Sequence, residues 1–394
     1  MEDRSRKSYF PKSHTIMKKE FLALSFILLF IISCKEEKKD GVHTNTIAIN
    51  LNQIYEPDFK EIFNSIEICP LEVSDSSFIG KFFSRKRAIY IPGKFYVVID
   101  ANYVIHLFDM NGKFISNSSK CIGQGPKEYF ILQDVAYNHV NNTIDILDPF
   151  GNVTIFDPHF RYVSKIKIKA QTKDRFRKLF VLDKTQYALF DDTERGSFII
   201  YDTSKNEAIK KVTYPGLIAE ISANSTPFTY SDHTFYFVPP EVNDQLFIYN
   251  KDEKKLIPSI RMNGGKRSIS KADLVHFTTT KEASEFIFQD SYKYTPVDRL
   301  YGQKYIISTY FNQQKTFINI CNITTHSNKT FKREENLRYN LPAFFSVVGN
   351  IGYAIVYPHD VEKFVDPELV INKNFLATIK EDDNPYIIKY SIKF

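Results

Sequence analysis

A short motif repeats along this chain at nearly even spacing. In each copy an apolar residue and an aromatic residue are followed by Asp or Asn at the end of a β-type run, as in Leu107-Phe108-Asp109. Four clear copies end at Asp109, Asp157, Asp202 and Asn250, a degenerate one at Asn322, and a weaker sixth copy is Lys389-Tyr390-Ser391. The steps are 48, 45, 48, 72 and 69 residues, and periods near 45 residues with several short strands are typical of β-propeller blades. We therefore predict an all-β, six-bladed β-propeller.

The chain ends soon after the third strand of the predicted sixth blade. Only two residues follow the run Tyr386 to Ile392, so this blade has no fourth strand of its own. Because an unpaired strand edge promotes aggregation, we predict N-to-C closure, in which the first ordered strand completes the last blade. Two runs precede the first blade, Thr46 to Leu51 and Ser65 to Leu71, and the sequence allows either to fill the gap.

The two long steps, of 72 and 69 residues, indicate insertions in the repeat. The first contains Ser270 and Asp273, spaced as a helix cap and a first-turn acid, followed by a helical pattern over Lys281 to Gln289. The second, Asp360 to Lys373, has a helical pattern around Val361 to Phe364. Blade-to-blade links and the loops between strands two and three leave a propeller from one face, so we expect two short helical insertions on that face, partly covering the central channel.

The N-terminus has the features of an export signal. Lys18 and Lys19 precede an apolar run, Phe21 to Ile32, that is too short to span a bilayer. Ile31-Ile32-Ser33-Cys34 resembles the bacterial lipobox, which predicts lipidation of Cys34. We expect a signal peptide with an upstream extension at 1–33, the lipidated Cys and a flexible tether at 34–46, and the propeller domain at 47–394. An ordinary secretory signal with an incidental Cys is the alternative.

Charge and cysteine content limit which kinds of partner and bound group this chain is expected to have. The formal charge is +6, but removing the six basic and three acidic residues of 1–34 leaves 46 basic and 43 acidic groups, which does not imply nucleic-acid binding. Cys69, Cys121 and Cys321 cannot all pair with one another, and we expect buried thiols. Without a CxxC or a Cys/His cluster, the sequence predicts no metal and no cofactor.

Three segments resemble a known family, the six-bladed propeller lipoproteins of Bacteroidetes, related to TolB-like and NHL-like propellers. They are Ser65-Ile66-Glu67-Ile68-Cys69-Pro70-Leu71-Glu72 with Phe78-Ile79-Gly80, the motif Gly123-Gln124-Gly125-Pro126-Lys127-Glu128-Tyr129, and Glu381-Asp382-Asp383-Asn384-Pro385. In the second, Lys127 stands where the family usually has Gly. The resemblance supports the fold and an outer-membrane location, periplasmic or surface-exposed, and assigns no activity.

The glycine motif is not a nucleotide-binding loop, because it lacks a Lys-Ser/Thr ending and no helix follows it. We expect its glycines to permit a tight crossing between blades. Glu128 is expected to accept hydrogen bonds from neighbouring backbone amides.

Two sets of polar residues are candidates for ligand binding on the insertion-bearing face. Asp100, Asp148 and Asp191 follow strand two in three successive blades, where they can hold a cation or sugar hydroxyls or simply accept hydrogen bonds from their own turns. Cationic side chains on the blade-to-blade links suit carboxylate or phosphate groups, or form a solvated loop surface. These cations are Lys127, Arg175, Arg177, Lys266 and Arg267.

These features favour a lipid-anchored, extracytoplasmic propeller that acts as a non-catalytic binding module for a glycan, peptide or protein partner and is a monomer. No catalytic set of residues is evident. The alternative is a lyase or hydrolase of acidic saccharides that uses Arg175, Arg177 or Asp148, which requires those side chains to converge. A third hypothesis is a signalling or assembly partner of an outer-membrane uptake system.

Overall fold

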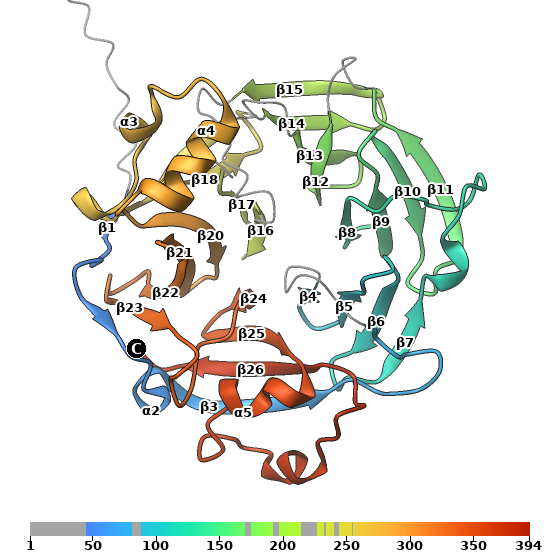
Figure 1. Cartoon of the computed structure of the whole chain (residues 1–394). Helices are drawn as coiled ribbons and strands as arrows, with labels where there is room; N and C mark the ends of the chain where they lie inside the picture. Colours follow the sequence, from blue (N-terminus) through green and yellow to red (C-terminus); the bar gives the residue numbers. More distant parts are fainter. Residues whose placement is uncertain are drawn as a thin grey trace, which may run out of the picture. The chain divides into compact units, whose positions relative to one another are not determined.

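Six sheets are arranged around a ring in the described part of the chain, and each is built on four antiparallel strands (Figure 1). Two of the sheets carry a fifth strand that pairs in parallel with the outer strand. The structure is a computed structural model and describes residues 45–80, 88–169, 175–191, 197–213, 227–231, 234–239, 244–253 and 255–394. Each sheet is one blade, with its first strand innermost. The all-β, six-bladed β-propeller predicted from the repeat is confirmed.

The first three blades follow one another along the chain. Blade one contains β4 (Ala88–Ile91), β5 (Phe95–Ile99), β6 (Ile105–Asp109) and β7 (Phe114–Asn117). Blade two contains β8 (Asp134–Asn138), β9 (Thr143–Leu147), β10 (Asn152–Phe156) and β11 (Tyr162–Lys167). Blade three contains β12 (Phe176–Val181), β13 (Gln186–Asp191), β14 (Ser197–Asp202) and β15 (Glu207–Thr213).

The other three blades each use a segment from outside the local repeat. Blade four contains β16 (Phe228–Ser231), β17 (Thr234–Phe237), β18 (Gln245–Asn250), β19 (Lys255–Asn263) and β1 (Asn45–Ala48). Blade five contains β20 (Thr295–Tyr301), β21 (Tyr305–Asn312), β22 (Lys315–Asn322), β23 (Asn328–Arg333) and β2 (Ile54–Tyr55). Blade six contains β24 (Phe344–Val348), β25 (Ile351–Val356), β26 (Tyr386–Ile392) and β3 (Phe63–Pro70).

The repeated Asp or Asn has one local task, which is to close the turn between strands three and four. Asp109 Oδ1 accepts hydrogen bonds from the amides of Asn111 and Lys113 at 2.8 and 2.9 Å. The equivalent bonds are made by Asp157, Asp202, Asn250 and Asn322. A side-chain oxygen that bonds to the backbone two residues ahead is the physical signature of this type of turn, so the repeat reports turn chemistry.

The apolar residues of the motif are buried between neighbouring blades. All five residues of β9 and all six of β14 are buried, because a middle strand is covered on both faces by the blades beside it. Between blades three and four the packing is aromatic: Phe198 lies 5.0 Å from Phe237 and 6.2 Å from Tyr249, measured between ring centroids. Such pairs add to the gain from burial alone.

N-to-C closure of the ring is confirmed, but the closing strand is not the first one. β3 pairs antiparallel with β26, from Tyr386 opposite Pro70 to Ile392 opposite Phe63. β3 is suited to closure because it ends beside blade one, where the Glu72 amide donates to the Gly112 carbonyl at 2.8 Å. The first strand, β1, instead pairs in parallel with β19 of blade four, and β2 pairs in parallel with β23 of blade five.

The two insertions leave from the same face, because both follow strands that run in the same sense. The first holds η4 (Gly265–Arg267), α3 (Lys271–Leu274), α4 (Thr280–Glu285) and the π-helical turn η5 (Phe286–Asp290). Ser270 and Asp273 form the expected capping box of α3. The insertion packs on the second and third strands of blade five, with Phe288 against Phe311 and Tyr294 against Phe317, both at 5.0 Å between ring centroids.

The second insertion does not cover the central channel, contrary to the prediction. It holds η6 (Pro358–Asp360), α5 (Val361–Phe364) and η7 (Lys373–Thr378), and its chain runs beside β3, the outer strand of blade six (Figure 1). The Ile66 amide donates to the Leu369 carbonyl at 2.9 Å, and the Ile371 amide donates to the Ile66 carbonyl at 3.0 Å. Backbone pairing with an open strand edge holds the insertion at the rim. Two small elements lie outside these groups, α2 (Phe59–Ile62) before β3 and η2 (Ser119–Cys121) after β7.

Candidate functional site

The glycine motif forms a tight loop on the link between blades one and two. Its ends are joined by backbone hydrogen bonds, from the Gly123 amide to the Tyr129 carbonyl and from the Tyr129 amide to the Cys121 carbonyl, both at 3.0 Å. Tyr129 is buried, and its hydroxyl donates to the Tyr103 carbonyl at 2.8 Å. The loop is therefore fixed to the turn between strands two and three of blade one.

Glu128 explains why the motif needs glycine. The Gly125 amide donates to Glu128 Oε2 at 2.8 Å, as expected for a carboxylate that accepts backbone amides. A Cβ atom added at Gly123 would lie 2.0 Å from the same oxygen, and one at Gly125 would lie 2.9 Å from it. The glycines thus make room for a carboxylate folded over the loop, and the tight crossing predicted from the sequence is present.

A cleft of about 280 Å³ opens between this loop and the turn after β9. Its walls combine backbone, two carboxylates, one lysine and two phenyl rings. The residues that line it are Gly123, Gln124, Gly125, Glu128, Tyr129, Phe130, Ile131, Ile146, Asp148, Phe150, Thr154 and Lys165. Phe130 is 62% exposed and Phe150 is 58% exposed, so more than half of each residue's surface is open to solvent.

Asp148 positions Phe150 at the edge of the cleft. Asp148 Oδ1 accepts hydrogen bonds from the amides of Phe150 and Asn152, both at 2.8 Å. Gly151 completes the turn with a φ of +85°, which favours glycine. A Cβ there would also lie 2.9 Å from the ring of Phe176. Asp148 therefore accepts hydrogen bonds from its own turn, one of the two roles that the sequence allows. These bonds hold the backbone of Phe150 in place.

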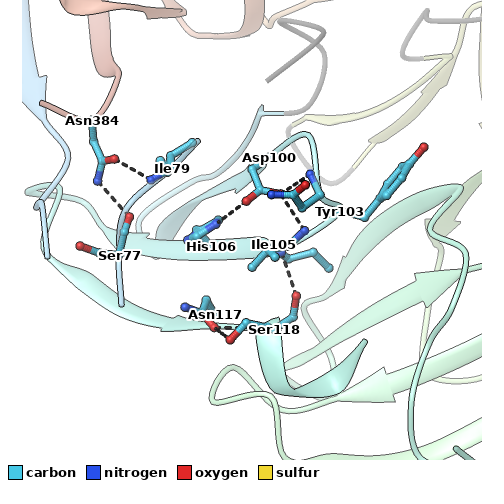
Figure 2. Close-up of polar contacts among 12 residues, drawn as sticks. Ser77, Ile79, Asp100, Tyr103, Ile105, His106, Asn117, Ser118 and Asn384 are labelled. Carbon is cyan, nitrogen blue, oxygen red and sulfur yellow. Dashed lines mark hydrogen bonds and ion pairs between the residues drawn. The ribbon is translucent and has the colours of Figure 1, made fainter. Parts of the chain in front are cut away.

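Asp100 occupies the equivalent turn of blade one and is buried. Its Oδ1 accepts hydrogen bonds from the amides of Asn102 and Val104 at 2.8 and 2.9 Å, and its Oδ2 lies 3.4 Å from His106 Nε2 (Figure 2). Burial alone would raise the pKa of Asp100, but the His106 side chain and the two amides outweigh burial and lower the pKa. The carboxylate is held within its own blade.

Asp191, the third carboxylate, is the last residue of β13 and is fully buried. Its Oδ2 lies 3.4 Å from Lys211 Nζ on the outer strand β15. Of the three aspartates predicted as ligand-binding residues, Asp148 lines the cleft described above. The binding role itself stays a prediction for all three.

The predicted cations lie on three different junctions of the ring. Lys127 lies within the glycine motif between blades one and two, and its Nζ lies 5.9 Å from the ring centroid of Tyr162. Arg175 and Arg177 flank Phe176 between blades two and three. Because the Phe176 amide donates to the Pro149 carbonyl at 3.1 Å, their backbone runs beside the turn that holds Asp148.

Lys266 and Arg267 lie in η4 between blades four and five, across the ring from Lys127. Arg267 Nε donates to Asn52 Oδ1 at 3.1 Å. The five cations are thus spread over separate blade junctions. Lys127 comes nearest to the cleft along the backbone, because it directly precedes Glu128, which lines the cleft.

The part of the sequence that the structure describes contains no group of three or more His, Cys, Asp or Glu residues placed to hold a metal ion. Cys69 and Cys321 are buried free thiols, as expected, and Cys121 is half-buried. Burial raises the pKa of Cys69 to about 11 and that of Cys321 to about 12. Across the described ranges, the helices lack the length and hydropathy needed to span a bilayer. Cys34, the predicted lipidation site, lies outside the described residues.

The cleft residues that the sequence analysis missed are the two phenylalanines and Lys165. Phenylalanine is common in this chain, with 35 copies, and most propeller positions bury it. One signal was present: Phe150 lies between Pro149 and Gly151 in a turn, where an aromatic ring has no strand neighbour to cover it. Nothing comparable identifies Phe130.

The comparisons with known proteins agree with this architecture. Residues 44–391 match a family model described as "Domain of unknown function (DUF4934)". A crystal structure from Bacteroides fragilis NCTC 9343, described as a "Putative exported protein", is similar over 89% of this chain and 100% of that chain, with a TM-score of 0.68 at 14% identity.

Two further solved structures match with lower TM-scores. A structure of U3-55K matches with a TM-score of 0.43 at 9% identity, over 83% of this chain and 98% of that one. The WD40 domain of Toxoplasma gondii coronin matches with a TM-score of 0.37 at 9% identity, over 76% and 71%. These two carry no argument about function. No curated protein matches the chain significantly in sequence.

Proposed function

Since the chain belongs to the family described as a domain of unknown function (DUF4934), which assigns it no activity, we propose a function from the cleft: a non-catalytic module that binds a glycan at the junction of blades one and two. The observation that carries the proposal is the pair of exposed aromatic side chains, Phe130 and Phe150, that line one cleft together with the glycines of the loop. Sugar rings stack their C–H faces on such side chains, and polar groups nearby fix their hydroxyls.

The size and rigidity of the cleft fit this role. At about 280 Å³ it is at the small end of ligand pockets, which run from about 300 Å³ upward, so it suits one unit or one end of a longer saccharide. Its walls are held by the bonds of Glu128 and Asp148 to their own loops. A preformed site loses little entropy on binding.

Non-catalytic binding is favoured over the lyase or hydrolase alternative by the state of the carboxylates. Asp148 accepts hydrogen bonds from two backbone amides and from the Asn152 side chain, and Glu128 is folded onto Gly125. Carboxylates engaged in this way position the backbone of their own loops and have fewer oxygen lone pairs left to face a substrate.

The test is a glycan array with neutral, carboxylated and sulfated oligosaccharides, followed by calorimetry on the hits. Phe150→Ala and Phe130→Ala are expected to weaken binding about tenfold each, since a stacked ring contributes about 1.4 kcal/mol for a factor of ten. Phe78→Ala is the matched control, because Phe78 is 55% exposed and does not line the cleft. Turnover of a bound saccharide, or equal loss in the control, would contradict the proposal.

We propose in addition that the protein is exported and anchored by lipid at Cys34, on the periplasmic or outer face of the outer membrane, as in TolB-like and NHL-like propeller lipoproteins. The support is the apolar run Phe21 to Ile32 before Ser33-Cys34, together with the description of the Bacteroides fragilis relative as exported. Metabolic labelling with a fatty-acid analogue should mark the protein and fail with Cys34→Ser. Labelling that persists in that variant would exclude the anchor.

A further inference from the structure

The outer strands of the blades differ in which segments of the chain contact them. In blades four and five the outer strand receives a parallel fifth strand, β1 or β2, from the N-terminal segment. In blade six, residues 369–371 of the second insertion hydrogen-bond to Ile66 of β3. In blade one, Glu72 Oε2 accepts the Phe114 amide at 3.0 Å, and the Ser76 carbonyl accepts from Asn117 Nδ2 at 2.5 Å. Four outer edges are thus covered by the chain itself.

The outer edge of blade two has no such cover within the described residues. β11 runs from Tyr162 to Lys167 at the rim of the ring (Figure 1), and six residues of strand span about 20 Å. Alternate residues of an edge strand direct their backbone N–H and C=O groups outward, where they are available to another strand. Val163 on this strand is 53% exposed.

The surroundings of this edge favour a particular kind of strand. A cavity of about 540 Å³ borders it, lined in part by Arg161, Val163 and Ser164. Lys165 and Lys167 are exposed, and their Nζ atoms donate to carbonyl oxygens, those of Glu128 and Phe150, at 3.3 and 2.7 Å. Within the described ranges neither lysine forms an ion pair, although Lys165 shares a cleft with the carboxylates of Glu128 and Asp148. The edge therefore presents two lysine charges that are not engaged in direct ion pairs.

We propose that the outer edge of blade two is a docking site for an extended, acidic segment of a partner protein, which adds to β11 as a fifth strand. The chain uses the same mode of strand addition on blades four and five. Addition of a peptide to a sheet edge draws its affinity from backbone hydrogen bonds and its specificity from side chains. A second copy of this chain is disfavoured, because pairing β11 with β11 would bring lysines face to face.

This edge adjoins the proposed glycan cleft, because Lys165 also lines that cleft and Lys167 Nζ donates to the Phe150 carbonyl. The two proposals are tested apart, because strand addition uses the backbone of β11 and glycan binding uses the rings of Phe130 and Phe150. The experiment uses the full exported domain and a capped peptide of alternating Glu and Val, seven residues long. Its comparison ligand is the same peptide with every backbone nitrogen methylated, which keeps the charge and side chains but removes the N–H donors. Binding is measured by fluorescence anisotropy, and hydrogen exchange locates the contact.

The unmodified peptide is expected to bind and to slow exchange of amides within 162–167. The methylated peptide is expected to bind at least about tenfold more weakly, since it loses two or more backbone hydrogen bonds. Val163→Glu should weaken binding about fivefold by placing a negative charge on the edge. Val140→Glu is the matched control: Val140 is 47% exposed in the β8–β9 turn of the same blade, and this variant should bind within about twofold of the parent.

Equal binding of the methylated peptide would show adhesion by charge alone and overturn the proposal. Protection at another strand, or no binding at millimolar peptide, would overturn it as well. Tight binding of an oligogalacturonate at this edge, without binding of the peptide, would show that the lysines bind a saccharide and would also overturn the proposal. Loss of glycan binding in the Phe150→Ala variant leaves the peptide result unchanged, so the two proposals fail separately.

Discussion

Removal of the Asn384 side chain should destabilise the ring closure strongly. Asn384 is fully buried at the junction of blades six and one (Figure 2). Its Oδ1 accepts the Ile79 amide at 2.7 Å, and its Nδ2 donates to the carbonyls of Glu72 and Ser77 at 2.7 and 2.9 Å. The side chain therefore fixes the segment that leads from β3 to blade one.

The cost of Asn384→Ala follows from the groups left without partners. The Glu72 carbonyl keeps a second donor, the Ser77 hydroxyl at 2.8 Å, but the Ile79 amide and the Ser77 carbonyl lose their side-chain partner. A buried polar group without a partner costs roughly 1 to 3 kcal/mol. We expect a loss of about 3 kcal/mol in the free energy of unfolding for the two groups together.

The matched control is Asn372→Ala. Asn372 also holds β3 through two backbone bonds, both to Ile68, at 3.1 and 2.7 Å. Asn372 is only partly buried, so water can replace its bonds and the expected cost is about 1 kcal/mol or less.

Urea unfolding followed by circular dichroism measures both variants, and hydrogen exchange at the Ile79 amide reports the local opening directly. A domain of this size can unfold in more than one step, so the exchange rate is the decisive quantity. If the free energy of unfolding of Asn384→Ala lies within about 1 kcal/mol of the parent value, or if the variant costs no more than Asn372→Ala, the Asn384 side chain does not fix the segment between β3 and blade one.

Three further predictions concern groups elsewhere in the ring. Burial raises the pKa of Asp145, against hydrogen bonds from Thr143, Tyr187 and Asn138. The stability that this group contributes is therefore present at low pH and is lost as the pH rises above the pKa that Asp has in the unfolded chain, near 4. The free-energy cost of Asp145→Asn should then decrease between pH 4 and 7. A cost that grows with pH would contradict this prediction. Cys121 should react first with a thiol reagent in the native protein, ahead of Cys69 and Cys321, whose pKa values are raised to about 11 and about 12; equal rates for the three thiols would refute the assignment. Gly123→Ala should destabilise by about 1 kcal/mol, because its Cβ would lie 2.0 Å from Glu128 Oε2 and would displace that flexible side chain from the Gly125 amide. Gly80→Ala, with nothing within 4 Å, should be nearly neutral by the same unfolding assay.

The sequence predicted those features that depend on neighbouring residues. The turn between strands three and four needs only an Asp or Asn and the two or three amides that follow it, and this local chemistry recurs at each step of the repeat. The capping box of α3 is another such feature, made by Ser270 and Asp273. Glu128 belongs to the same class, since its acceptor role needs only Gly125, three residues before it.

The predictions that were wrong, and the features that were not predicted, depend on contacts between distant segments of the chain. The choice of β3 over β1 as the closing strand requires knowing that β3 ends beside Gly112 of blade one. The place of the second insertion depends on an open edge at Ile66, about three hundred positions earlier in the chain. Exposure of Phe130 and Phe150 likewise depends on which loops meet at a blade junction.

By itself, the sequence determined the number of blades, the positions of the turns and the need for an N-terminal closing strand. It did so because hydrogen bonds over two to four residues form wherever their donors and acceptors occur in that order. Only the tertiary structure decided which early segment closes the ring, which outer edges are covered and where the cleft lies. Those outcomes rest on bonds such as that between Ile79 and Asn384, 305 residues apart, whose partners no local pattern can pair.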